Sequence, residues 1–326
     1  MKLSILDLAH VPMDSDVGQA LRNTLDLARR VDGLGYERFW LAEHHNMPGI
    51  ASAATSVVIG LVAAATQRIR VGSGGIMLPN HAPLVIAEQF GTLEALFPGR
   101  IDLGLGRAPG TDGLTWRALR RDPRAAEHFP DDVQELQLLL GPAQPGQRIR
   151  AVPGADSNVP LWILGSSLFG AQLAARLGLP YAFASHFAPA ALHDALRVYR
   201  ESFQPSAQLQ APYAMAGVNV VCAPTDEEAQ HLFTSLQRVV IGLVTGNRGR
   251  LAPPEPIEPL PPNVQHAVDG FLGCSFVGAP ATVHAGLQQL MAGTGADELI
   301  VASAIFDHAA RVRSYELLAD AAGLPR

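Results

Sequence analysis

The chain has 326 residues, of which 48% are hydrophobic and 17% are charged. Its 24 basic and 30 acidic residues give a net charge of −6 without any basic block, which argues against non-specific nucleic-acid binding. The two cysteines, Cys222 and Cys274, are far apart and have no CxxC partner, which disfavours a disulfide scaffold and a cysteine-rich metal site.

The sequence carries no recognisable targeting or membrane segment. The first apolar run is very short and meets Asp7, unlike the apolar region of a signal peptide. The uncharged stretch 51–66 is too short to span a bilayer and suits a helix packed inside the protein. We therefore expect a soluble cytoplasmic protein without membrane contact.

Short apolar runs alternate with helical patterns along the whole chain. The predicted strands are Leu3–Leu8, Arg38–Glu43, Arg70–Gly74, Ile101–Leu105, Leu161–Leu164, Tyr181–Ala184, Gly217–Cys222 and Glu298–Ala302. The predicted helices are Gly18–Leu34, Ser52–Thr66, Leu84–Leu96, Asp132–Leu140, Phe169–Leu177, Pro189–Phe203, Asp226–Leu243, Ala281–Ala292 and Arg311–Ala321. Strict alternation requires parallel strands with right-handed crossovers, so eight units predict one α/β domain over 1–326, a (β/α)8 TIM barrel. An open doubly wound sheet is the alternative.

Two insertions interrupt this alternation, one after the fourth strand (108–130) and one before the eighth strand (246–263). The first carries four arginines among acidic residues, and the second carries six prolines. Long loops in a compact domain are usually functional or disordered. The first insertion follows a strand directly, which predicts a lid over the barrel mouth; an ordinary solvated loop is the alternative.

The second strand ends in a carboxylate and two imidazoles, Glu43, His44 and His45. Side chains alternate across a strand, so Glu43 and His45 face one way and His44 the other. Neighbouring histidines on an extended backbone cannot easily share a metal, and no HxH or HExxH spacing is present, so we expect no metal site. We predict that His44 is a catalytic imidazole, whereas His45 either shares that role or pairs with Glu43.

Glycines and phosphate-binding signals follow other strands. Gly72, Gly74 and Gly75 at one strand end predict either close approach of a flat ligand or a tight turn. Arg107, just past the fourth strand, can clamp a phosphate or form a surface salt bridge; the surrounding GxGxxxG spacing does not match the Rossmann fingerprint.

The run Leu164-Gly165-Ser166-Ser167 leads from a buried strand into a helix. Backbone N–H groups and serine hydroxyls at such a helix start can bind a phosphate, and Ser167 can also cap the helix. His186 lies at another strand exit and gives a weaker signal than His44. These features together indicate an enzyme that binds a phosphorylated planar cofactor.

Five stretches of the sequence resemble the bacterial luciferase-like flavin-dependent monooxygenases, in particular their stand-alone, non-light-emitting branch. In chain order they are Trp40–His45, Val71–Pro79, Pro98–Arg107, Val277–Pro280 and Gly295–Leu299. The resemblance covers nearly the whole chain and implies a TIM barrel with an FMN site at its C-terminal mouth. It further implies that reduced FMN reacts with O2 to form a flavin hydroperoxide, which oxygenates a small organic substrate.

By the same resemblance, His44 and His45 are the catalytic positions. Gly74 and Gly75 lie under the flavin, with a non-proline cis peptide as one option, and Arg107 with the 165–167 turn holds the phosphate. Light-emitting members carry a reactive cysteine where this chain has Gly106, which argues against light emission. The family also implies a homodimer and a separate NAD(P)H-dependent flavin reductase. Three alternatives remain: a deazaflavin-dependent oxidoreductase, a non-catalytic flavin-binding protein, and a metal-dependent hydrolase, which strand geometry disfavours.

Overall fold

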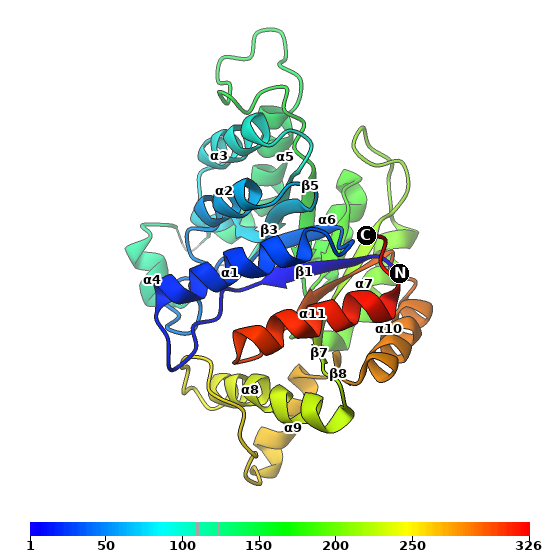
Figure 1. Ribbon diagram of the computed structural model, residues 1–326. Coiled ribbons are helices and arrows are strands. Elements are labelled where there is room, and N and C mark those ends of the chain that lie inside the picture. The colour runs from blue at the N-terminus through cyan, green and yellow to red at the C-terminus, as the bar shows by residue number, and fades with distance from the viewer. Residues whose placement is uncertain (109–110, 123) are drawn as a thin grey trace.

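The computed structural model describes residues 1–108, 111–122 and 124–326. Eight parallel strands close into a barrel that is surrounded by helices (Figure 1). They follow chain order around the ring, and the last of them closes it against the first: β1 (Leu3–Asp7), β2 (Arg38–Leu41), β3 (Arg70–Met77), β4 (Ile101–Gly106), β5 (Leu161–Gly165), β6 (Tyr181–Phe183), β7 (Ala214–Cys222) and β9 (Glu298–Ala302). The predicted (β/α)8 barrel is confirmed, and the open sheet is excluded.

One further strand, β8 (Ser275–Gly278), lies outside this ring and was not predicted. It pairs in parallel with the second half of β7, whose first three residues pair with β6 instead. The nine residues of β7 are long enough to serve both neighbours. The four-residue run of β8 is only half-buried over three positions, so its hydrophobic signal in the sequence is weak.

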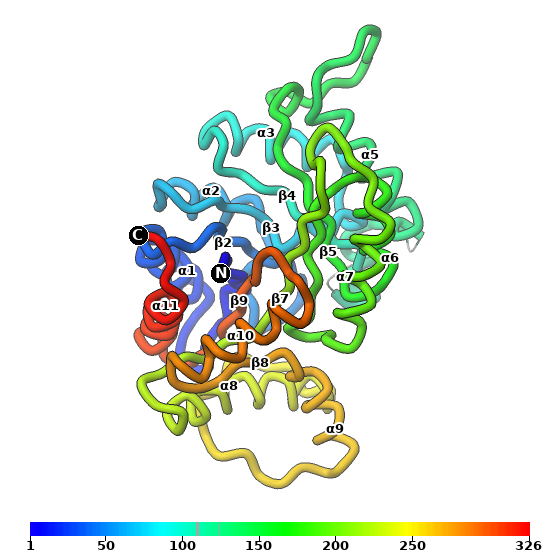
Figure 2. Tube along the Cα trace, turned by 90° about the vertical axis from the view of Figure 1, so that its right-hand side faces the viewer, coloured from blue at the N-terminus to red at the C-terminus, as the bar shows by residue number. Residues whose placement is uncertain are grey.

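Nine of the helices match the predicted ones within a few residues at their ends. They are α1 (Val17–Val31), α2 (Thr55–Ala65), α3 (Pro83–Leu96), α5 (Phe129–Leu140), α6 (Leu168–Leu177), α7 (Leu192–Glu201), α8 (Asp226–Val244), α10 (Pro280–Thr294) and α11 (His308–Ala322). Two were not predicted, α4 (Gly113–Ala118) inside the first insertion and α9 (Pro262–Phe271) at the end of the second. The helix α9 packs beside α8 at one edge of the molecule (Figures 1 and 2). Within the described residues, no helix is both long and apolar enough to cross a membrane.

Aromatic side chains fill the inside of the barrel. Trp40 and Trp162 meet edge to face with ring centroids 5.1 Å apart. Leu6, Met215 and Ile300 join them in a buried cluster that is separate from the larger core between the strands and the helices. The barrel is therefore a packed core, as the fold requires, and not a channel.

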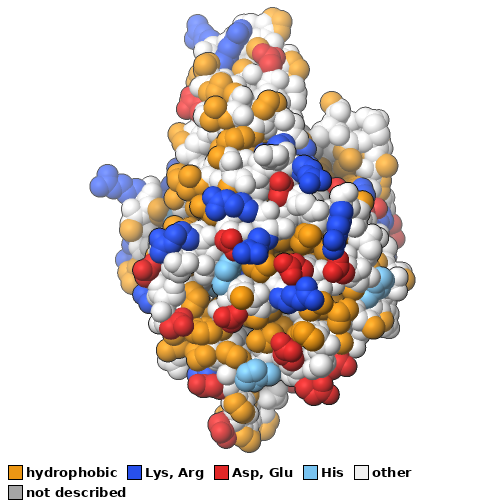
Figure 3. Space-filling model, viewed as in Figure 1, with side chains coloured by type: hydrophobic (Ala, Val, Ile, Leu, Met, Phe, Trp, Pro, Cys, Tyr) orange, Lys and Arg blue, Asp and Glu red, His pale blue; other side chains and the backbone are white. Residues whose placement is uncertain are grey.

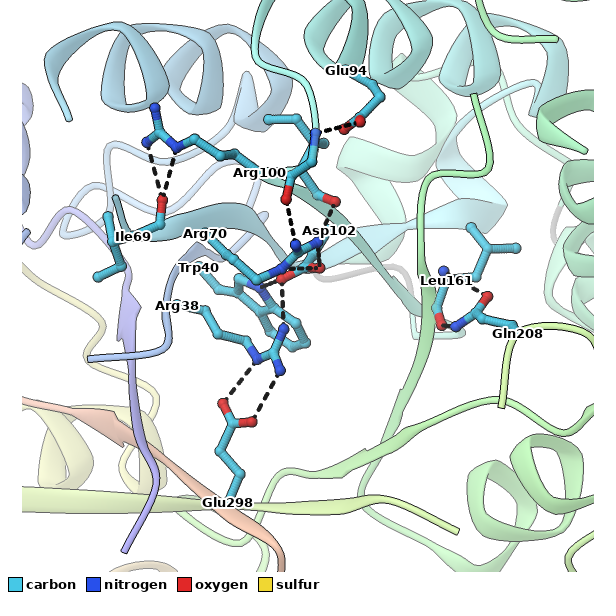
Figure 4. Close-up of polar contacts among 12 residues, drawn as sticks. Arg38, Trp40, Ile69, Arg70, Glu94, Arg100, Asp102, Leu161, Gln208 and Glu298 are labelled. Atoms are coloured by element: carbon cyan, nitrogen blue, oxygen red, sulfur yellow. Dashed lines mark hydrogen bonds and ion pairs between the residues drawn. The ribbon is translucent and has the colours of Figure 1, made fainter. Parts of the chain in front are cut away.

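A network of charges closes the N-terminal end of the barrel (Figure 4). Asp102 accepts hydrogen bonds from Arg38 at 2.9 Å, from Arg70 at 2.6 Å and from the indole of Trp40 at 3.2 Å. Glu298 accepts two more from Arg38, at 2.9 and 3.1 Å. Because each carboxylate is buried and fully hydrogen-bonded, this end is structural, and the opposite, C-terminal end is the one open to chemistry.

Candidate active site

The chain leaves β2 earlier than predicted, because the strand ends at Leu41 and not at Glu43. The following loop is tied to the start of α2: Ser52 and Thr55 donate to the carbonyl of Ala42 at 2.5 and 3.0 Å. The backbone N–H of His44 in turn donates to the carbonyl of Ser52 at 3.0 Å. These bonds hold the Glu-His-His segment in place although it lies outside the sheet.

Three imidazoles converge on the C-terminal mouth of the barrel: His44, His10 after β1 and His186 after β6. Burial is the main cause that lowers the pKa of His10 to about 4; the charges of Arg311 and His44 lower it further. Burial likewise lowers the pKa of His186 to about 4, again with a contribution from the charge of His44. Both side chains are therefore neutral near pH 7.

Sequence reasoning missed His10 and gave His186 little weight. No alternation signal was available for His10, because β1 ends at Asp7 and Ala9 has a positive φ of 51°, which breaks the strand pattern before His10. Gly217 on β7 makes room for His186, since a Cβ at that glycine would collide with the imidazole. The mouth thus depends on a glycine from one strand and a histidine from its neighbour.

Glu43 faces away from His44 and is surrounded by hydrogen-bond donors. His45 lies 2.8 Å and His81 2.9 Å from its Oε1, and the backbone N–H of Met77 donates to Oε2 at 3.0 Å. Burial raises the pKa of Glu43, but the hydrogen bonds from His45 and His81 outweigh it and bring the pKa to about 2. The Glu43–His45 pair, one of the two interpretations of His45, is therefore present, while a catalytic role of His45 stays a prediction. Among the described residues, no group of three or more His, Cys, Asp or Glu is arranged to hold a metal ion.

The peptide bond between Gly74 and Gly75 is cis, as the resemblance suggested. Neighbouring strands crowd both residues. A Cβ on Gly74 would lie 2.7 Å from Leu6, and one on Gly75 would lie 2.7 Å from the carbonyl of Gly104 and 3.2 Å from Leu164. Glycine at these positions is thus required by the approach of the strands themselves, and we call Gly74 and Gly75 the glycine wall of the mouth.

The two predicted phosphate-binding elements lie side by side. The guanidinium of Arg107 lies 4.1 Å from the ring centroid of Phe169 in the first turn of α6, the helix that the 165–167 turn leads into. Ser166 and Ser167 are exposed, and Ser167 makes no capping hydrogen bond through its side chain. In the described part of the chain, Arg107 forms no ion pair. A positive group, two hydroxyls and a helix start therefore share one exposed patch next to the glycine wall.

The first insertion rests on the cluster around Glu43. The indole N–H of Trp116 donates to Asn80 at 2.9 Å, and Arg121 donates to the carbonyls of Pro79 and His81 at 2.9 and 3.0 Å. Thr111 donates to the carbonyl of His45 at 3.1 Å. Residues 109, 110 and 123 of this insertion lie outside the described ranges.

The second insertion is ordered against the exit of β1. The N–H of Leu251 donates to the carbonyl of Val11 at 2.9 Å, and the N–H of Met13 donates to the carbonyl of Leu251 at 2.8 Å. The side chain of Arg238 on α8 donates to the carbonyl of Pro253 at 3.1 Å. This proline-rich segment therefore forms part of the wall beside His10 and is not a detached loop.

Comparison with known proteins gives the same family that the sequence resembles. The family model for luciferase-like monooxygenases matches residues 1–298. A luciferase-like monooxygenase of Escherichia coli (strain K12) is 52% identical over 322 residues, which cover 97% of this chain and 96% of that protein. An N-acetyl-S-alkylcysteine monooxygenase of Bacillus subtilis (strain 168) is 31% identical over 330 residues and 98% of each chain.

Several solved structures share the fold of this chain. The crystal structure of apo-MsnO8 is 37% identical, with a TM-score of 0.92 over 100% of this chain and 99% of that one. At 16% identity, the oxygenating constituent of 3,6-diketocamphane monooxygenase in complex with FMN shares the fold with a TM-score of 0.76. An F420-dependent secondary alcohol dehydrogenase shares it at 14% identity with a TM-score of 0.72. The chain belongs to the luciferase-like monooxygenase family.

Proposed function

We propose that the protein is an FMN-dependent monooxygenase that uses reduced FMN and O2 to oxygenate a small organic substrate. The observation that carries this proposal is the set of groups that follow the strands at the C-terminal end of the barrel. Arg107 packs on Phe169 beside the Ser166-Ser167 turn, Leu164 lies against Gly75, and His44 and His186 follow β2 and β6. An anion-binding patch, the glycine wall and imidazoles at one end of the barrel match a phosphate, a planar ring and a reacting edge.

In this arrangement each group has a defined task. Arg107 and the N–H groups and hydroxyls of the 165–167 turn would hold the phosphate. Leu164 and Gly75 would contact the ring from one side. Bound reduced FMN would supply the electrons that activate O2. His44 holds or moves a proton at the reacting edge, and the neutral rings of His10 and His186 keep that edge free of competing charge.

The phosphate assignment is tested by comparing FMN with riboflavin, which has the same ring but no phosphate. We expect the Arg107→Ala variant to bind FMN about 10-fold or more weakly, since a charge-assisted phosphate contact is worth roughly 1.5–3 kcal/mol. Its affinity for riboflavin should stay within about twofold of wild type. An equal loss for both ligands in fluorescence titrations would remove Arg107 from the phosphate site.

The redox assignment is tested by adding O2 to anaerobic protein loaded with reduced FMN and a panel of small apolar substrates. We expect oxygen-containing product, and a drop in kcat of about 100-fold or more for His44→Ala with FMN affinity within a few-fold of wild type. The exposed His193 on α7 supplies the matched control, because His193→Ala should retain wild-type turnover. Full activity of His44→Ala would remove His44 from the mechanism.

A deazaflavin-dependent oxidoreductase is the second candidate, favoured by the fold that the chain shares with the F420-dependent alcohol dehydrogenase. Tighter binding of the deazaflavin than of FMN, with hydride transfer that needs no O2, would establish this candidate instead. Tight FMN binding without any product would indicate a flavin-binding protein. Under the proposed function, the protein works in the cytoplasm as a homodimer and receives reduced FMN from a separate NAD(P)H-dependent reductase.

A further inference from the structure

A small hollow lies between the exit of β1 and the start of α11, next to His10. Three of the buried polar atoms that line it have no hydrogen-bond partner within the described residues: Ser303 Oγ, His308 Nδ1 and Arg311 Nε. Leaving a buried donor or acceptor unsatisfied costs about 1–3 kcal/mol each. Three such atoms around one hollow therefore indicate a shared partner.

The size and chemistry of the hollow fit one water molecule. It offers a water molecule about 10 Å³, close to the roughly 10–15 Å³ that a single water needs. The Nε–H of Arg311 can only donate, and the hydroxyl of Ser303 can donate or accept. His308 Nε2 lies 2.9 Å from the carboxylate of Asp26, which can only accept, and in the tautomer that donates from Nε2 the other nitrogen, Nδ1, presents a lone pair. One water satisfies all three atoms, as buried waters typically do.

The hollow also connects the mouth with the surface. His10 forms part of the wall of the hollow, and the charge of His44 contributes to lowering the pKa of His10. On the far side, His308 leads to Asp26, whose side chain is 40% exposed and also binds Arg30. The charged groups around His10 are Asp7, Arg311 and His44, and Asp7 and Arg311 form a buried ion pair at 2.7 Å. This ion pair places one positive and one negative charge at fixed positions beside the hollow.

We propose that the hollow binds one ordered water that links His10 to His308 and makes a proton path between His10, at the mouth, and Asp26 and solvent. The proposal rests on the proposed function, which needs proton exchange between a buried mouth and the solvent. Each step moves one proton from a donor to the lone pair of the next group, and no electrons are transferred. An imidazole takes a proton on one nitrogen and releases one from the other, so His308 bridges the water and the carboxylate.

A crystal structure of the protein at about 1.5 Å resolution tests the water site independently of any reaction. We expect one water with its oxygen about 2.7–3.2 Å from Ser303 Oγ, His308 Nδ1 and Arg311 Nε. The Ser303→Val variant, whose second methyl group fills the space, should lack that water. Ser303→Ala should keep it through the other two partners. A wild-type map without density between these atoms would overturn the water site.

The path is tested with His308→Gln, whose amide can still donate to Asp26 but cannot relay a proton. In the FMN-loaded protein we expect kcat to fall about 10-fold or more with an increased solvent isotope effect, while the FMN dissociation constant stays unchanged. His284, which binds the carbonyl of Ala321 at the other end of α11, provides the control, and His284→Gln should retain wild-type kcat.

Two results count against the path. If His308→Gln and Ser303→Val both keep wild-type kcat and isotope effect, protons reach the mouth by another route and the path is wrong. If wild-type protein shows no turnover with FMN at all, the path fails together with the proposed function. The crystallographic experiment then still decides whether the water site exists.

Discussion

At the residue scale, the Glu43-His44-His45 segment has two faces with different functions. His44 joins His10 and His186 at the mouth, whereas Glu43 binds His45 and His81 on the other side. Strand alternation predicted this separation, and it persists although β2 ends at Leu41. Glu43 therefore supports the segment from the side that carries His45 and His81.

We expect Glu43→Gln to lower the free energy of unfolding by about 2–4 kcal/mol at pH 7, since an amide cannot satisfy two imidazoles and a backbone N–H as a buried carboxylate does. Because folding lowers the pKa of Glu43 from 4.5 to about 2, its contribution is complete above pH 4.5 and disappears as the pH falls towards 2. The difference between the two proteins should shrink over that window in urea titrations. Glu135→Gln, at an exposed position of α5, should show no such pattern.

At the scale of elements, the two insertions are attached to the barrel through hydrogen bonds, most of them to backbone carbonyls. The segment with α4 donates from Trp116 and Arg121 to residues 79–81, next to the loop that carries His45. The helix α4 itself has no buried residue, so its position depends on these few polar contacts. An element held in this way can open at low energetic cost, which suits a lid.

We expect Arg121→Ala to release this segment. The loss of two hydrogen bonds, worth about 1 kcal/mol each, should increase amide hydrogen exchange of residues 111–122 by about 10-fold or more. Global stability should change by less than about 1 kcal/mol, because the barrel itself is untouched. Arg124→Ala is the control, since its side chain is 75% exposed and pairs only with Asp122 among the described residues. Unchanged exchange in Arg121→Ala would mean that other contacts hold the segment.

At the scale of the whole molecule, the two ends of the barrel and its outer faces differ in character. Buried ion pairs close the N-terminal end, and the mouth gathers imidazoles and glycines. On the face with α1 and α11, basic and acidic side chains are interspersed (Figure 3). The neighbouring helices α2 and α3 instead expose apolar side chains along one line each: Val57 and Leu61 on α2, and Val85 and Leu96 on α3.

This apolar face supports the proposed homodimer. The helix α2 contains no charged residue, and Leu61 is 54% exposed. We expect Leu61→Glu to shift the protein from dimer to monomer in sedimentation experiments, because a buried unpaired carboxylate at an interface is strongly unfavourable. Leu243→Glu, at an exposed position of α8, should leave the dimer intact. A wild-type protein that sediments as a monomer at micromolar concentration would contradict the dimer.

Much of this structure could be predicted from local patterns. The order of strands and helices follows from the alternation of apolar runs and helical periodicity, and eight such units permit few arrangements other than a barrel. His44, Arg107 and Ser167 can be recognised in the sequence because each follows a predicted strand. Parallel strands have their carboxyl ends on one face of the barrel, so these residues are expected at the same end. The strand β8 and the helices α4 and α9 were missed because they are short and only partly buried.

The sequence by itself determined the fold class and the strand ends that carry the site, because both depend on residue periodicity and on the direction of the chain. Only the tertiary structure decided which groups meet. It brought His10 and His186 to His44 from strands distant in sequence, paired Glu43 with His81, and placed Ser303, His308 and Arg311 around one hollow. These contacts depend on the closure of the barrel and on packing between distant segments. Neither closure nor long-range packing leaves a periodic signal in the sequence.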